Sequence, residues 1–309
     1  MIIVFGSVNL DLVARVARLP QPGETLAGEA FAMLPGGKGA NQALAAARAG
    51  GEVRLVAAVG DDAFAAPALA RLAAGGVDLA GVRRVGAPTG VALIHVDGRG
   101  ENAITVIAGA NALADPAWLP DESLEAGTTL LLQLEVPLAA VVAAAARART
   151  RGARVMLNAA PMQLLPQALV ATLDVLLVNE TEAAAMAGML GAPATPDEFA
   201  TAVHRKFGVA TVVTLGGEGA FAAADGHLYA VPAPPVRVVD TTGAGDAFCG
   251  ALAAALDRNA TWPRALAEAI AAGSLACTAS GAQPALPDAQ AIAALAATVG
   301  GRVVTIAAG

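Results

Sequence analysis

The chain passes through Val239-Asp240-Thr241-Thr242-Gly243-Ala244-Gly245-Asp246-Ala247-Phe248-Cys249-Gly250, a strand end and a glycine turn that lead into an apolar helix. A helix start offers unpaired N–H groups and the positive end of the dipole, so it favours an anion. Gly243 and Gly245 have no Cβ and let the backbone approach that anion. Asp246 would repel it, which makes sense if Asp246 takes a proton from an attacking hydroxyl. The stretch therefore predicts an anion-binding helix start with a built-in base.

A second glycine-rich helix start lies in the N-terminal part, at Leu34-Pro35-Gly36-Gly37-Lys38-Gly39-Ala40-Asn41-Gln42, before an alanine-rich helix over about 40–49. It is not a P-loop, because the first glycine of that pattern is missing and no Ser or Thr follows the lysine. It is not a dinucleotide fingerprint either. Gly37 and Gly39 would bring backbone close to a compact ligand, with Lys38 and Asn41 as hydrogen-bond partners. A helix start with a flexible entry is the alternative.

Outward from these two stretches, strands and helices alternate. Buried strands are expected at Ile2–Phe5, Arg54–Gly60, Thr129–Leu134, Val155–Leu157, Val175–Val178 and Thr211–Leu215. The alternation predicts an α/β three-layer sandwich with a mostly parallel central sheet covered on both faces. A hairpin over Thr89–Val96 and Asn102–Ile107 interrupts it. We expect this hairpin to form an appendage with the stretch around 10–34, and a second hairpin at 220–230.

Several polar residues sit at ends of expected elements. Asn9 and Asp11 alternate along one face and can bond the vicinal hydroxyls of a sugar, or they make ordinary turn bonds. Glu135 follows a buried strand, at the usual ligand edge of an open α/β sheet. Asn179 and Glu182 have the spacing of a helix capping box, which is a structural explanation in itself.

Composition narrows the classes of partner. The chain has 309 residues, of which 56% are hydrophobic, 15% charged and 3% aromatic, and its formal charge is −7. Few aromatics and negative charge argue against nucleic acid, and no uninterrupted apolar run predicts a membrane span. Two cysteines suit a reducing compartment, so a cytoplasmic protein is expected. The N-terminal residues predict a first strand and not a signal peptide.

Taken together, these stretches resemble the PfkB-type carbohydrate kinases and, among them, the ribokinase-like members. The resemblance runs nearly end to end and rests on the order and spacing of six motifs: Gly6–Asp11, Pro22–Thr25, Gly36–Ala43, Asn179–Glu182, Asp240–Asp246 and Gly281–Pro284. It implies one ribokinase-like kinase domain over 1–309 with a small β-sheet lid formed by about 9–36 and 88–108. It also implies ATP-dependent phosphorylation of D-ribose at O5, and a homodimer made through the lid strands.

The resemblance also implies roles for single residues. Asp246 matches the catalytic base, and the anion hole matches Gly243, Ala244 and Gly245. The sugar site matches Asn9, Asp11, Gly37, Lys38, Gly39, Asn41, Glu135 and Asp246. The ATP site matches Asn179, Thr214, Leu215, Gly216, Gly217, Glu218, Gly219 and Gly245. Glu182 matches an acid linked indirectly to Mg²⁺. An activating K⁺ site matches Asp240 with the carbonyls of Thr242, Ala276, Ala279 and Gly281.

Two positions depart from the family pattern. Ala159 stands in Asn158-Ala159-Ala160-Pro161 where Asn-Pro-Ala-Pro is common, and Ala285 stands where some members offer a serine oxygen to the cation. The second departure bears on the strength of K⁺ activation. Two alternatives stay open: a kinase of the same family for deoxyribose, fructose, another pentose or a nucleoside, and a sugar-binding sensor that has lost catalysis.

Overall fold

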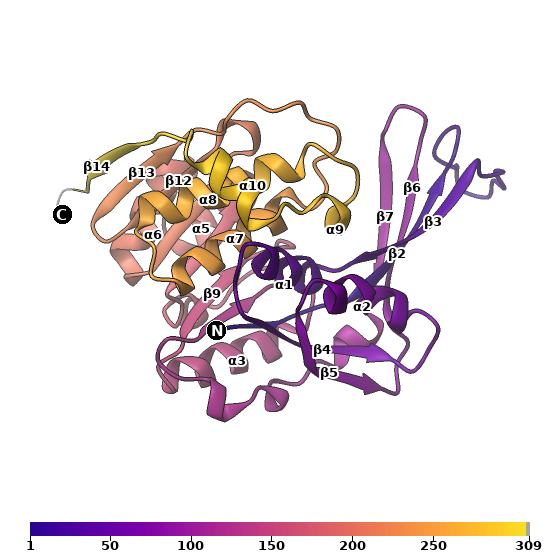
Figure 1. Ribbon diagram of the computed structural model, residues 1–309, viewed down its shortest axis with the longest axis horizontal. Coiled ribbons are helices and arrows are strands. Elements are labelled where there is room, and N and C mark those ends of the chain that lie inside the picture. The colour runs from indigo at the N-terminus through magenta and orange to yellow at the C-terminus, as the bar shows by residue number, and fades with distance from the viewer. Residues whose placement is uncertain (307–309) are drawn as a thin grey trace.

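Two β-sheets organise the computed structural model, which describes residues 1–306 of the chain (Figure 1). In the described residues the larger sheet has ten strands in the order β14-β13-β12-β11-β10-β9-β8-β1-β4-β5. These are β1 (Ile2–Phe5), β4 (Val53–Gly60), β5 (Asp78–Val85), β8 (Thr129–Leu132), β9 (Arg154–Asn158), β10 (Val175–Asn179), β11 (Ala210–Thr214), β12 (Ala220–Ala224), β13 (His227–Val231) and β14 (Arg302–Thr305). The neighbouring strands β5, β4, β1, β8, β9, β10 and β11 run parallel to one another. Strands β12, β13 and β14 each pair with the preceding strand in antiparallel fashion.

Helices cover both faces of this sheet, because its strands are apolar on both sides. In β1, Ile2 and Val4 join the core under one set of helices, while Ile3 and Phe5 join the core under the other. The first set is α1 (Lys38–Arg48), α2 (Ala65–Ala74), α7 (Ala244–Asp257), α8 (Trp262–Ala276) and α10 (Ala289–Ala296). The second is α3 (Leu138–Thr150), α4 (Gln167–Val170), α5 (Glu180–Leu190) and α6 (Pro196–Phe207). The predicted three-layer sandwich is confirmed.

Helices α1 and α7 lie unusually close together. A Cβ on Gly250 of α7 would lie 2.6 Å from both the Ala45 Cβ and the Ala46 nitrogen of α1. Small residues at such a crossing let two helix backbones approach. The close approach brings the two glycine-rich helix starts, at Lys38 and at Ala244, to the same end of the sheet.

The smaller sheet, in the order β3-β2-β6-β7, projects from one end of the molecule (Figure 1). It consists of β2 (Asn9–Arg15), β3 (Ala30–Gly36), β6 (Gly90–Val96) and β7 (Asn102–Ile107). Strand β2 pairs with β3 in antiparallel and with β6 in parallel fashion. The expected pairing of the stretch around 10–34 with the hairpin is therefore confirmed. Because β2 follows β1 directly, the small sheet is anchored where the central strands end.

The strand end expected at Val239 is wrong. The segment Val236–Val239 has no regular structure and connects β13 to α7 as an extended loop. Three prolines, at 232, 234 and 235, remove the N–H groups that a ladder would need. The Val239 N–H instead donates to the Cys277 carbonyl at 2.8 Å, which fixes the loop against the end of α8.

The short elements complete the chain. They are α9 (Ala282–Ala285) and the 3₁₀ turns η1 (Gly109–Leu113), η2 (Pro116–Trp118), η3 (Asp121–Ser123) and η4 (Gly216–Glu218). Among residues 1–306, every helix is too short or too polar to cross a membrane.

Candidate active site

Asp246 lies in the first turn of α7, and the side chains of α1 hold it. Asn41 Nδ2 donates to Asp246 Oδ2, and Gln42 Nε2 donates to Asp246 Oδ1, each at 2.9 Å. Helix α7 begins after Gly243, whose φ of 77° is the left-handed conformation that glycine tolerates best. The carboxylate is 7% exposed. Two amide donors therefore fix a buried acid at the positive end of a helix.

The start of α1 is bonded to residues from the first strand and from the end of β8. The Lys38 N–H donates to Glu135 Oε2 at 2.9 Å, and the Ser7 hydroxyl donates to the same oxygen at 2.6 Å. The Gly39 N–H donates to Ser7 Oγ at 3.2 Å. A Cβ on Gly37 would lie 2.8 Å from the Asn9 nitrogen. These glycines thus let α1 sit directly against the end of the first strand.

Asn9 and Asp11 lie on β2, beside this cluster. Asn111 Nδ2 donates to Asn9 Oδ1 at 2.7 Å and to the Val8 carbonyl at 3.1 Å, and Asn111 Oδ1 accepts from the Val8 N–H at 2.9 Å. Gly36 on the paired strand β3 leaves the room that the Asp11 carboxylate occupies, since a Cβ there would overlap it. Asn9 is therefore rigidly oriented, and Asp11 is packed beside the strand that leads to Lys38.

Electrostatics in the site are dominated by three acids and one lysine. Burial, reinforced by Glu135 and Asp246, raises the pKa of Asp11 to about 7. Burial also raises the pKa of Asp246, although Lys38 and the two amides counteract it. For Lys38, burial acts to lower the pKa, but the charges of Asp246 and Glu135 outweigh it and the pKa is raised. The lysine stays charged, and Asp246 is moved toward the range in which a base accepts a proton near neutral pH.

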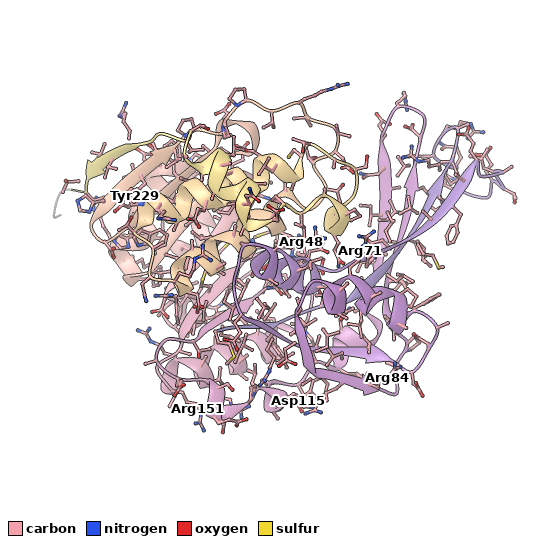
Figure 2. All side chains as sticks on the ribbon, viewed as in Figure 1. Arg48, Arg71, Arg84, Asp115, Arg151 and Tyr229 are labelled. Atoms are coloured by element: carbon pink, nitrogen blue, oxygen red, sulfur yellow. The ribbon has the colours of Figure 1, made fainter. Side chains whose placement is uncertain are left out.

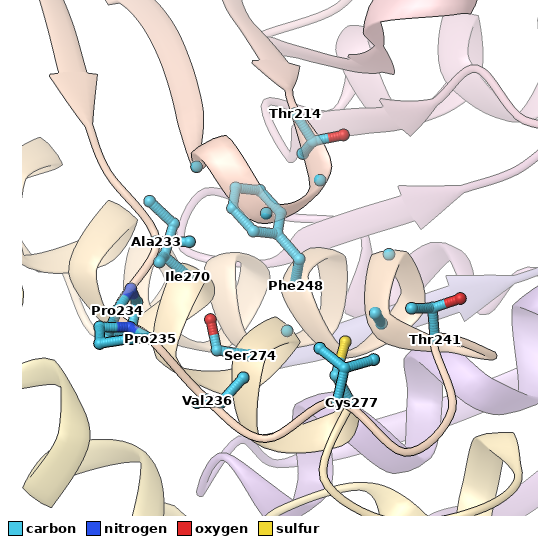
Figure 3. Close-up of a pocket in the computed structure, with 17 residues that line it drawn as sticks. Thr214, Ala233, Pro234, Pro235, Val236, Thr241, Phe248, Ile270, Ser274 and Cys277 are labelled. Carbon is cyan, nitrogen blue, oxygen red and sulfur yellow. The ribbon is translucent and has the colours of Figure 1, made fainter.

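Two cavities meet at the start of α7. A polar cavity of about 140 Å³ is lined by Lys38, Asn158, Asn179, Glu182, Asp246 and their neighbours. An apolar pocket of about 480 Å³ lies on the other side, between β11, the 232–241 loop, α7 and α8. Figure 3 shows Phe248 and Ile270 on its helical wall and Pro234 and Pro235 along the loop. Thr214 and Gly245 line both cavities, so the two are joined at the α7 start.

The residues expected to bind a nucleotide divide between these cavities. Thr214, Gly216, Gly217, Gly219 and Gly245 line the apolar pocket, whereas Asn179 lines the polar one. Leu215 packs into the core on the α3–α6 face instead. Glu218 is exposed in η4.

Asn179 and Glu182 form the predicted capping box at the start of α5. The Glu182 N–H donates to Asn179 Oδ1 at 2.7 Å, and the Asn179 N–H donates to Glu182 Oε2 at 2.8 Å. Glu182 is nevertheless buried in the wall of the polar cavity. Burial raises the pKa of this carboxyl, with the Asn179 bond and Lys38 opposing the shift. The capping interpretation is confirmed, and it leaves the second oxygen available to the cavity.

Asp240 ties two loops together outside the cavities. Its Oδ1 accepts from the Thr242 N–H at 2.9 Å and from the Thr242 hydroxyl at 2.6 Å, and its Oδ2 accepts from the Gly281 N–H at 2.8 Å. Although burial opposes it, these bonds lower the pKa of Asp240. The carboxylate is thus ionised where the chain enters α7 and where it leaves α8. In residues 1–306 no three His, Cys, Asp or Glu side chains group as a metal site.

Four buried amides were not among the expected site residues: Gln42, Asn111, Gln133 and Gln283. Gln42 bonds both Asp246 and Asn158 Oδ1, the latter at 3.0 Å. Gln133 and Gln283 donate to Gln42 and Asn41. Gln42 and Gln283 stand inside the motifs Gly36–Ala43 and Gly281–Pro284, so the sequence did indicate that these two residues lie near the site. Asn111 lies in a segment with no motif, and its contacts span more than a hundred residues.

Comparisons with known proteins agree with this geometry. The family model of the pfkB carbohydrate kinases matches residues 1–289. A ribokinase of Haemophilus influenzae is 36% identical over 291 residues, which cover 93% of this chain and 95% of that protein. A deoxyribokinase of Salmonella typhimurium is 34% identical over 93% of this chain and 95% of its own. The structure of Arabidopsis thaliana ribokinase complexed with ribose and ATP superposes with a TM-score of 0.86 at 34% identity, covering 96% of this chain and 98% of that one.

The sandwich, its joined cavities and the buried acid at a helix start define this protein as a small-molecule kinase. Since the family model spans most of its length, the chain belongs to the PfkB family of carbohydrate kinases.

Proposed function

We propose that this kinase transfers the γ-phosphoryl group of ATP to O5 of D-ribose, giving D-ribose 5-phosphate and ADP. The observation that carries the proposal is the place of Asp246. It lies at the helix start shared by an apolar pocket and a polar cavity, with both oxygens held by amides. The similarity to ribokinases over nearly the whole chain supports ribose as the acceptor.

In the proposed reaction the apolar pocket takes the adenine end of ATP, and the glycine turn at 216–219 lies along it. Asn9, Asp11 and Asn41 bond the hydroxyls of the sugar and direct O5 toward Asp246. Asp246 accepts the O5 proton as O5 bonds to the γ-phosphorus, and the bond from that phosphorus to the β,γ-bridging oxygen breaks, so that ADP leaves. Lys38 and the N–H groups of the first α7 turn stabilise the charge on the transferred group.

Mg²⁺ fits the polar cavity as a partner of the nucleotide. In proteins Mg²⁺ keeps several waters and binds through one or two carboxylates together with substrate phosphates. Glu182, buried in this wall with one oxygen free of the capping bond, suits such an indirect role. When bound, Mg²⁺ supplies neutralisation of phosphate charge.

K⁺ fits the loops that Asp240 joins, since a carboxylate and backbone carbonyls are all oxygen donors. Asp240 with the carbonyls of Thr242, Ala276, Ala279 and Gly281 would hold it. When bound, K⁺ supplies positive charge beside the loop that leads into α7. Ala285 adds no side-chain oxygen, so we expect activation to depend on Asp240 and the backbone carbonyls.

The sugar that accepts the phosphoryl group has a second candidate. The deoxyribokinase relative is almost as similar as the ribokinases, so 2-deoxyribose is the second candidate. Ribose, 2-deoxyribose, fructose, another pentose and a nucleoside should be compared by coupled ADP detection, with and without K⁺. A site that bonds hydroxyls rejects analogues lacking them, so kcat/KM should be highest for ribose. A higher value for deoxyribose would replace the first candidate, and ribose binding without ADP would indicate a sensor.

The role of Asp246 is tested by Asp246→Asn, which keeps the shape of the side chain. Turnover should fall by a factor on the order of 10²–10⁴, while calorimetry should show ribose binding nearly unchanged. Asp257→Asn is the matched control at the other end of α7, where Asp257 pairs with the N-terminal amine at 3.1 Å. Turnover like that of the wild type in Asp246→Asn would exclude this base.

The small sheet is proposed as a lid over the sugar and as the contact between two subunits. Its strands carry Asn9 and Asp11 on one side and leave apolar side chains such as Phe31, Met33 and Leu93 exposed on the other. Sedimentation at assay concentrations should show a homodimer, and a monomer would contradict this. We place the enzyme in the cytoplasm, where ATP and reduced cysteines are expected.

A further inference from the structure

Four buried side-chain amides converge on Asp246 from two directions. On one side Gln133 Nε2 donates to Gln42 Oε1 at 2.8 Å, and Gln42 Nε2 donates to Asp246 Oδ1 at 2.9 Å. On the other side Gln283 Nε2 donates to Asn41 Oδ1 at 3.1 Å, and Asn41 Nδ2 donates to Asp246 Oδ2 at 2.9 Å. Each carboxylate oxygen therefore ends a chain of two amides.

The carboxylate fixes the direction of both chains. An ionised carboxylate only accepts hydrogen bonds, so the NH₂ groups of Gln42 and Asn41 must face Asp246. Their carbonyl oxygens then face away and need donors of their own. Gln133 and Gln283 supply these donors, which leaves the oxygens of these two outer glutamines at the far ends of the chains.

Those two oxygens have no partner. Within residues 1–306, Gln133 Oε1 and Gln283 Oε1 are the buried side-chain atoms that lack a hydrogen bond. An unsatisfied buried acceptor is destabilising, because it has lost its bonds to water and gained none in the protein. Gly6 makes room for one of them, since a Cβ there would overlap Gln133 Oε1. In the described part of the chain, both oxygens lack a hydrogen bond because the amides of the two chains all point their NH₂ groups toward Asp246.

We propose that Gln133 and Gln283 are positioning residues that fix the direction of both amide chains and so hold Asp246 ionised and aimed at the acceptor hydroxyl. This inference rests on the proposed role of Asp246 as base. Hydrogen bonds to the charged form of an acid favour that form, and aligned amides polarise one another. The two glutamines act from separate places, the end of β8 and α9. Arg48 of α1, which Figure 2 labels, donates to the Gln283 carbonyl of α9 at 3.1 Å.

Other charged groups also act on Asp246. Lys38 of α1 and Glu135 after β8 affect its pKa, and Asp246 in turn affects Asp11 of β2 and Cys249 of α7. All four groups remain in a glutamine variant. A change in the titration of Asp246 on substitution therefore reports the amides and not the surrounding charges.

The test replaces each outer glutamine with methionine, which has similar size and no amide. In Gln133→Met and in Gln283→Met, kcat should fall about 3–10-fold, as expected for one weakened hydrogen bond. KM for the sugar should change less than about twofold, and the acidic limb of the pH–kcat profile should move up by about half to one pH unit. Gln163→Met is the matched control, because Gln163 Nε2 donates only to the Leu134 carbonyl, at 2.7 Å. It should leave the limb in place.

Double variants separate positioning from a general structural effect. If Gln133 acts through Gln42, then Gln133→Met should lower kcat no further in a Gln42→Met background. Losses that multiply, or a lower kcat with an unmoved acidic limb, would overturn the proposal. Should Gln133→Met fail to fold, Gln283→Met tests the same inference on the other chain.

A titration without substrate keeps this inference separate from the proposed function. Carboxyl ¹³C NMR, assigned with Asp246→Asn, should show a higher pKa for Asp246 in both glutamine variants than in the wild type. An unchanged pKa of Asp246 would overturn the inferred role of Gln133 and Gln283, whichever sugar the enzyme phosphorylates. If the wild type phosphorylated no sugar, the proposed function would fail, while the titration would still decide the inference.

Discussion

Helices α1 and α7 both begin after a glycine with positive φ, 90° at Gly37 and 77° at Gly243, but their first turns meet different partners. At α1 the N–H groups of Lys38 and Gly39 are bonded by Glu135 and Ser7. At α7 the Ala244 N–H bonds the Thr241 carbonyl at 3.2 Å. The next two residues lie where a helix has no acceptor of its own, at the junction of the two cavities.

The difference assigns separate tasks to the two helix starts. An anion at α1 would meet the Glu135 carboxylate in place of free N–H groups and would be repelled. That helix offers side chains instead, Lys38, Asn41 and Gln42. The start of α7 keeps its dipole end for a ligand. We therefore expect a glycine-rich helix start to bind an anion only where no protein group from another element has already bonded its N–H groups.

Gly39→Ala should have the largest effect on the fold. A Cβ there would overlap the Ser7 nitrogen and lie 2.6 Å from the Gly6 carbonyl carbon, both of them backbone atoms. Overpacking against a rigid neighbour should lower the free energy of unfolding by about 3 kcal/mol. Urea denaturation measures this loss. A variant as stable as the wild type would mean that α1 does not lie as close to the first strand as described.

Gly245→Ala makes the same change at the other helix start and should leave the fold intact. A Cβ there meets no atom within 4 Å, and Gly245 borders both cavities. Alanine is also the better helix former, so stability should be unchanged or slightly higher. In the proposed reaction the methyl group would crowd the transferred phosphoryl group. We therefore expect kcat/KM to fall about 100-fold, a loss as large as that of one donor to a developing charge. Full activity in this variant would move the anion site away from α7.

Local patterns in the sequence were enough to predict the central sheet, the hairpin appendage and the capping box at Asn179. Each depends on residues near one another in the chain. The edge strand β5 was not predicted, since Gly81, Arg83 and Arg84 give it no apolar run. The strand end expected at Val239 was wrong because the prolines before it outweigh the β-branched residues of that segment.

The site was predictable only as far as its motifs extend. Asp246, Lys38 and Asn41 stand in such motifs, and the structure brings them together. Their orientation depends on contacts between distant segments, such as Gln42 with Gln133 and Asn9 with Asn111. An isolated glutamine or asparagine in a sequence does not indicate what it will bond. The role of Gly39 as a sugar contact remains a prediction, because its N–H already bonds Ser7.

The smallest expected effect concerns the acids gathered near α1. The pKa of Asp11 is about 7 in the folded protein, against an ordinary value of 3.8 for an exposed aspartate, so the folded form binds the extra proton between these values. The contribution of Asp11 to stability is therefore full at low pH and is lost as pH rises through about 7. From about pH 6 to about pH 7.5 the free energy of unfolding should fall by about 1 kcal/mol more in the wild type than in Asp11→Asn. Asparagine mimics the protonated acid, so the difference between the two proteins isolates this group from the histidines. Denaturation without sugar at both pH values measures this difference in the free energy of unfolding. If the two proteins had the same pH dependence, Asp11 would be ionised throughout this range, and the acids near α1 would carry their full negative charge.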